Sequence, residues 1–99
     1  MIDRRFYDEQ VRVFSAAGEE VGAAHFIGGA EQTQQGEKWS GHLEVDFDPG
    51  DIVGQEFRLV FEDGAEGNAL CMATRILPRR APTTWSIGLR GNGMPPRLG

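Results

Sequence analysis

Apolar and polar residues alternate along much of the chain, and a period of two is typical of β-strands with one buried face. The clearest runs lie at 39–47, 57–62 and 84–90, and residues 20–27 form a weaker run. The residues expected in the core share the odd register of the three clear runs: Trp39, Leu43, Val45, Phe47, Phe57, Leu59, Phe61, Trp85, Ile87 and Leu89.

Two further segments complete a set of about six strands. Val11 and Val13 share a face near the start, and residues 68–77 are apolar on both faces, which suits a central strand or a barrel corner. Glycines and prolines separate the runs, because glycine accepts positive φ and proline fixes φ. The pattern predicts an all-β fold: a small single-domain antiparallel β-barrel or sandwich.

One segment is also compatible with a helix. Ser15 could cap a helix over residues 15–24. However, Gly18 and Gly22 would each cost about 1 kcal/mol relative to alanine in a helix interior. We therefore favour a hairpin that turns at Ala17 and Gly18.

The domain boundaries follow from length and periodicity. A chain of 99 residues fits one domain, which we expect to span residues 1–90. Within it, the polar residues 29–37 are expected to form an exposed loop. Residues 91–99 lack periodicity and are expected to form a flexible C-terminal tail.

The composition favours a cytoplasmic, bacterial protein. The sequence contains no run of about 18 apolar residues, the length that a membrane-spanning helix needs. Charged residues at Asp3, Arg4 and Arg5 stand where a signal peptide needs an apolar stretch. Cys71 is the single cysteine and can form no internal disulfide, which favours a reducing compartment. Arginine, alanine and glycine are plentiful, as in proteins from GC-rich bacterial genomes, so the number of arginines says little about function.

Charge is unevenly distributed along the chain. Residues 1–66 hold all 15 acidic residues and five basic ones, a net charge of −10, whereas residues 67–99 hold five arginines and no acid, a net charge of +5. Such a division suggests a charged partner or self-association. Alternatively, neighbouring antiparallel strands from the two parts cancel each other's charge locally, since opposite charges across strands stabilise sheets.

Residue types that perform catalysis or bind metals are sparse. His25, His42 and Cys71 do not have the close pairwise spacing of zinc ligands. Cys71 lacks the basic neighbour that a reactive thiolate needs, and neither a Gly-x-Ser-x-Gly elbow nor a phosphate loop is present. We therefore expect no enzyme, no metal and no cofactor.

An acidic cluster follows one strand face. Glu44, Asp46 and Asp48 are spaced by two, and Asp51 follows in the next loop. Oxygen-rich loops can hold calcium, but Phe57 stands where an EF-hand needs its last glutamate. We interpret the cluster as a solvated acidic face.

The most suggestive segment runs from Arg75 to Pro82. Arg79 and Arg80 lie between two prolines, in a stiff exposed loop where guanidinium groups could bind carboxylate or phosphate in bidentate fashion. Nucleic acid is a weaker candidate, because the sequence pI is about 4.9 and most aromatic residues are expected to face inward.

The sequence therefore favours a non-enzymatic protein-interaction or self-assembly module that binds a protein partner or forms a homo-oligomer. The alternative is a domain that binds a small anionic ligand or nucleic-acid phosphate through the Arg75–Arg80 region. The four arginines are expected to contact either the four acids of a neighbouring copy or a similar acidic patch on another protein. The expected partner-binding residues are Arg75, Arg79, Arg80, Arg90, Glu44, Asp46, Asp48 and Asp51.

Overall fold

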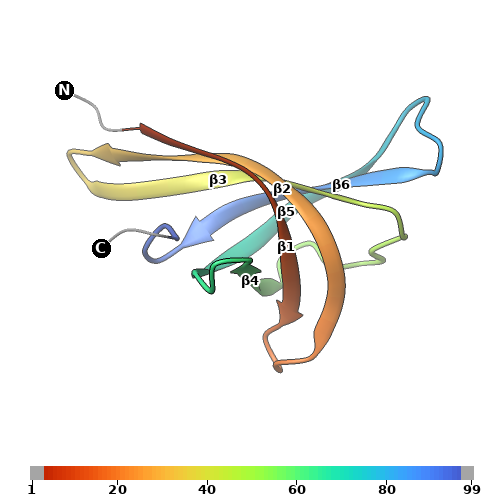
Figure 1. Ribbon diagram of the computed structural model, residues 1–99, viewed down its shortest axis with the longest axis horizontal. Coiled ribbons are helices and arrows are strands. Elements are labelled where there is room, and N and C mark those ends of the chain that lie inside the picture. Colours follow the sequence, from red (N-terminus) through yellow and green to blue (C-terminus); the bar gives the residue numbers. More distant parts are fainter. Residues whose placement is uncertain (1–3, 97–99) are drawn as a thin grey trace.

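Six antiparallel strands form a closed barrel in the computed structural model, which describes residues 4–96 (Figure 1). The ring order is β1-β2-β3-β6-β5-β4, which confirms the all-β prediction and decides between barrel and sandwich. The described range contains no helix, and so none that could cross a membrane. The strands are β1 (Arg4–Ser15), β2 (Glu20–Thr33), β3 (Gly36–Val45), β4 (Glu56–Phe61), β5 (Glu66–Leu77) and β6 (Thr84–Asn92).

A tight hairpin joins β1 and β2, as predicted in preference to a helix. The Gly18 amide donates to the Ser15 carbonyl over 2.9 Å, and Gly18 has a φ of 87° that favours glycine. Further along, a bulge lies at Val21, because Val13 pairs with Gly22 and Phe14 with Glu20. The bulge bends β2 near the barrel mouth.

The predicted loop at 29–37 is wrong. β2 and β3 pair without a break from His25–Glu44 to Thr33–Gly36, which leaves only Gln34 and Gln35 as the turn. This end of the hairpin reaches past the core, so side chains on both of its faces contact solvent. The sequence is therefore polar on both faces, like that of a loop, although the backbone hydrogen bonds of the two strands still form.

The predicted C-terminal boundary also moves. β6 continues to Asn92, and Pro95 and Pro96 are buried. The Tyr7 hydroxyl donates a buried hydrogen bond to the Pro96 carbonyl over 2.7 Å. Residues 91–96 therefore pack on the barrel, and residues 97–99 of the expected tail lie outside the described range.

The core fills the barrel interior in the predicted register. Every predicted core residue is buried except Phe47 and Trp85, which are half-buried against the core. His42 and Glu44 are half-buried on the other face of β3, as the alternation requires. The core also includes residues that the sequence pattern did not single out, among them Tyr7, Phe26, Ala30 and Ala69.

The strands β5 and β6 extend beyond the barrel. β4 pairs with β5 only as far as Glu56–Leu70, whereas β5 and β6 stay paired to Leu77–Thr84. We call residues 75–85 the arm; it projects at the upper right of Figure 1. A bulge between Cys71 and Ala73 precedes it, and the apolar residues beyond the bulge are not a core segment, since Ile76 is 54% exposed.

Candidate functional site

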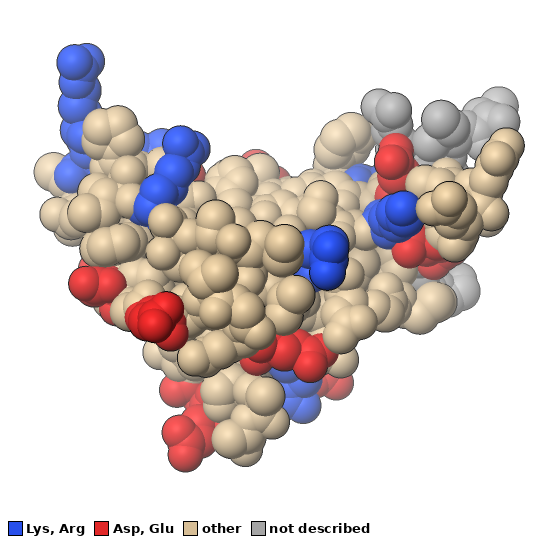
Figure 2. Space-filling model, turned by 180° about the vertical axis from the view of Figure 1, so that it is seen from behind, with Lys and Arg blue, Asp and Glu red and all other residues tan. Residues whose placement is uncertain are grey.

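Arginines gather on the arm. Arg75, Arg79 and Arg80 are all exposed, and Arg75 and Arg79 form no ion pair with any residue of the described range. Arg80 differs, because its Nη2 lies 3.8 Å from Glu44 Oε1 in the same chain. In Figure 2 the arm lies at the upper left, and basic side chains project from that corner.

The acidic end of β3 lies beside this arm. Glu44 pairs across strands with Ser86 on β6, and Ser86 pairs in turn with Arg75 on β5. His42 also approaches Glu44, with 3.8 Å between His42 Nε2 and Glu44 Oε1. Part of the opposite charge of the two chain segments is therefore neutralised within one molecule, as expected if neighbouring strands cancel each other's charge.

The remaining predicted acids lie on the β3–β4 loop, residues 46–55. Asp46, Asp48 and Asp51 are exposed. Asp48 Oδ1 accepts the Gly50 amide hydrogen over 2.9 Å, so one of its oxygens stabilises the turn. Within residues 4–96, no three His, Cys, Asp or Glu side chains are placed to hold a metal ion.

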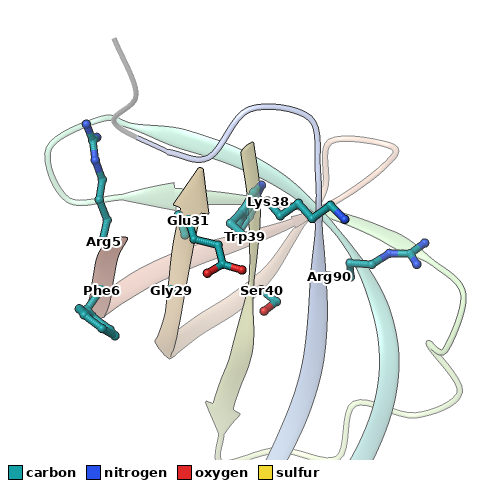
Figure 3. Close-up of a pocket in the computed structure, with 9 residues that line it drawn as sticks. Arg5, Phe6, Gly29, Glu31, Lys38, Trp39, Ser40 and Arg90 are labelled. Atoms are coloured by element: carbon teal, nitrogen blue, oxygen red, sulfur yellow. The ribbon is translucent and has the colours of Figure 1, made fainter. Parts of the chain in front are cut away.

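Arg90 is separated from the arm. It lies opposite Ser40 of β3, two outward-facing positions along β6 from Ser86. Figure 3 shows its side chain extending in the same direction as that of Lys38. The two cations border an open depression of about 590 Å³, whose other lining residues include Phe6, Gly29, Glu31 and Ser40.

Phe6 is a residue of this depression that the sequence analysis missed. Its side chain is 82% exposed, whereas the adjacent Tyr7 is buried. The signal was present, because successive side chains of a strand point to opposite faces and an aromatic pair must place one ring outside. The ring lies across the depression from Lys38 and Arg90, with Glu31 between them (Figure 3).

In the described range, the polar contacts of Cys71, His25 and His42 do not join these residues to one another. Cys71 is buried, and burial raises the pKa of its thiol, which favours the protonated form over the nucleophilic thiolate. His25 Nε2 contacts Asp8 Oδ1, and its Nδ1 lies 3.3 Å from Gln10 Nε2, far along the sheet from Cys71. Neither histidine has the thiol or a hydroxyl among its polar contacts in the described chain.

Comparison with protein-family models, with curated proteins and with solved structures finds no match. The candidate sites are therefore two: the arm with its neighbouring acids, and the depression beside Phe6, Lys38 and Arg90.

Proposed function

We propose that this domain is a non-enzymatic interaction module that binds an acidic protein surface through its arm. The observation that carries the proposal is the pair of exposed arginines, Arg75 and Arg79, which have no acidic partner in the described chain. Ile76 lies between them in sequence and is also exposed. Apolar contact area beside guanidinium groups is typical of interface residues.

The backbone at Arg79 supports the same proposal. Arg79 has a φ of 60°, the left-handed conformation that glycine or asparagine adopts at much lower cost. A strained residue at an exposed tip suggests that its side chain serves a function there. A guanidinium at the tip of a projecting hairpin is well placed to reach a carboxylate on another molecule.

A second copy of the chain offers a suitable acidic surface. Asp46 and Thr84 line one cleft, so the acidic loop and the base of the arm are neighbours. When acidic and basic surfaces adjoin, a two-fold axis lets each copy present its arm to the acids of the other. This arrangement favours a closed dimer. Head-to-tail stacking would be favoured instead if the acidic and basic surfaces lay at opposite ends of the molecule.

The test is the oligomeric state of the purified protein, measured by size-exclusion chromatography with light scattering. Exposed ion pairs are worth about 0–1 kcal/mol each, so several must act together, and salt should weaken them. We expect association at about 50 mM salt that is lost at about 500 mM. Arg79→Glu with Arg80→Glu should abolish it, and adding Asp46→Arg with Asp48→Arg should partly restore it.

A labelled polyglutamate serves as the probe for an acidic partner other than a second copy. Binding should be sensitive to salt and lost in the Arg79→Glu, Arg80→Glu variant. Arg90→Glu is the matched control, since it reverses one exposed arginine outside the arm and should keep both association and binding. The proposal is overturned if the arm variant retains the wild-type oligomeric state and polyglutamate affinity.

The second candidate function is binding of a phosphate-bearing ligand, which we place at the depression rather than at the Arg75–Arg80 region. The depression favours it, because it is bordered by the exposed Phe6 ring on one side and by Lys38 and Arg90 on the other, and bases stack on aromatic rings while cations contact phosphates. Fluorescence anisotropy with labelled oligo-dT tests this candidate. Phe6→Ala and Arg90→Glu should each weaken binding, and Arg79→Glu should not; equal affinities would exclude this candidate.

A further inference from the structure

A small apolar cavity of about 150 Å³ lies at the barrel mouth beneath the β3–β4 loop. Its wall is almost entirely aliphatic and aromatic: Val13, Val21, Leu43, Val45, Phe47, Pro49, Ile52, Phe57 and Ile87. We propose that this cavity binds a small, uncharged apolar molecule about the size of one aromatic ring. The proposal is independent of the arm and of its partner.

The cavity follows from how β2 and β3 separate. Their ladder ends at His25–Glu44, and β2 carries its bulge at Val21 beyond that point, where a bulged strand bends. The Phe47 ring closes the resulting gap by lying against Gly22, where a Cβ would be 3.3 Å from Phe47 Cε1. The barrel interior therefore opens under Phe47 instead of ending in a packed layer.

The lining determines the chemistry of the ligand. The two polar lining residues are already engaged, because Ser15 Oγ accepts the Glu19 amide hydrogen over 3.2 Å and Gln55 Nε2 donates to the Asp51 carbonyl over 3.3 Å. No charged side chain lines the wall. An apolar cavity of about 150 Å³ is large enough to accept benzene, whereas a polar ligand would lose its hydrogen bonds with water.

The β3–β4 loop offers a way in. Its far end is fixed to β5, since the Gly54 amide donates to the Cys71 carbonyl over 2.8 Å and the Cys71 amide donates to the Gln55 carbonyl over 2.9 Å. The described hydrogen bonds of residues 47–53 stay within the loop. Phe47 and Ile52, both half-buried, can therefore shift without breaking a strand ladder.

Benzene and naphthalene are the probes, and binding is followed through backbone amide shifts in heteronuclear NMR titrations. We expect benzene to shift the amides of lining residues on β3 and β6 in a saturable manner, and naphthalene to bind more weakly. Val45→Phe fills the cavity and should weaken benzene binding about tenfold or more. Val60→Phe is the matched control, because Val60 lies on the outer face of β4 and should leave the affinity unchanged.

A second variant covers the case in which Val45→Phe does not fold. Ile52→Ala lies in the loop outside the strands and enlarges the cavity, so the affinity for naphthalene should rise relative to benzene. The proposal is overturned if benzene causes no saturable shift at the lining amides of the wild type. It is also overturned if Val45→Phe folds and leaves the affinity for benzene unchanged. If Val45→Phe does not fold, the proposal is overturned when Ile52→Ala leaves the affinity for naphthalene relative to benzene unchanged.

Discussion

At the scale of single residues, two glycines determine where the Trp39 ring lies. A Cβ on Gly91 would stand 2.1 Å from Trp39 Nε1, and one on Gly67 would stand 3.0 Å from Trp39 Cη2. The indole therefore packs directly on the backbone of β6, and its buried Nε1 has no hydrogen-bond partner in the described chain. Gly91 is required for this close approach, not for an unusual φ.

Gly91→Ala should therefore destabilise the fold. The new methyl group forces the Trp39 ring to move, and overpacking of this kind costs about 1–3 kcal/mol. Gly88→Ala on the same strand is the control, because its Cβ would meet Ala73 at an ordinary 3.7 Å. Urea denaturation compares the two variants, and equal unfolding free energies would contradict this packing account.

The buried thiol of Cys71 gives a prediction with a defined pH dependence. Burial raises its pKa above the ordinary value of 9.0, so the native state holds the proton at a pH where the unfolded chain has lost it. The protonated thiol contributes fully to the free energy of unfolding below the pKa that Cys71 has in the unfolded chain. This contribution is lost as the pH rises through the pKa that Cys71 has in the folded protein. We expect slow labelling by a thiol reagent at about pH 8, fast labelling in denaturant, and a less steep alkaline loss of stability in Cys71→Ala.

Predictions for single residues succeeded where a strand has one face against the core and the other in water. The odd register of 39–47 identified the buried face, because one side of β3 meets the core and the other meets water. Phe47 departs from it because β3 ends at Val45 and the chain leaves the ladder there. Phe6 was missed because alternation is recognisable only from Val11 onward, so the adjacent aromatic pair Phe6 and Tyr7 was the one signal for it.

At the scale of elements, the arm combines a strained turn with exposed charge. β5 and β6 extend past β4, so the arm tip lacks a neighbouring strand on that side. Sequence alone could place Arg79 and Arg80 in a stiff loop between two prolines. It could not place Glu44 beside Arg80, because that contact depends on β3 and β6, which are distant in sequence, being neighbours in the sheet.

Arg79→Gly should stabilise the protein while weakening binding by the arm. Glycine relieves the cost of a side chain at a φ of 60°, which amounts to about 1 kcal/mol. Arg80→Gly is the comparison, since Arg80 has no positive φ and loses its contact with Glu44. Denaturation curves should rank Arg79→Gly above wild type and Arg80→Gly below it; the reverse order would contradict the strain at Arg79.

At the scale of the whole molecule, strand β1 and the segment that follows β6 meet at one end of the barrel. Tyr7 of β1 is hydrogen-bonded to Pro96, and a Cβ on Gly67 would lie 2.7 Å from Pro96 Cγ. The segment after β6 therefore covers the Trp39 end of the core. No periodicity indicated this role, because the segment packs through two prolines rather than through a strand.

A chain shortened to end at Met94 should consequently be less stable than the full-length protein. It loses the Tyr7–Pro96 hydrogen bond, worth about 1 kcal/mol, and the burial of Pro95 and Pro96. Together with the water then reaching Trp39, we expect a loss of about 2–4 kcal/mol.

The matched control ends at Pro96 and keeps both the Tyr7–Pro96 hydrogen bond and the two buried prolines, so it should be more stable than the chain ending at Met94. Tyr7→Phe removes only the hydrogen bond and should cost about 0.5–1.5 kcal/mol. Chemical denaturation followed by tryptophan fluorescence measures all three, since Trp39 reports on this end of the barrel. If the chain ending at Met94 unfolds at the same denaturant concentration as the one ending at Pro96, Pro95 and Pro96 do not stabilise the barrel.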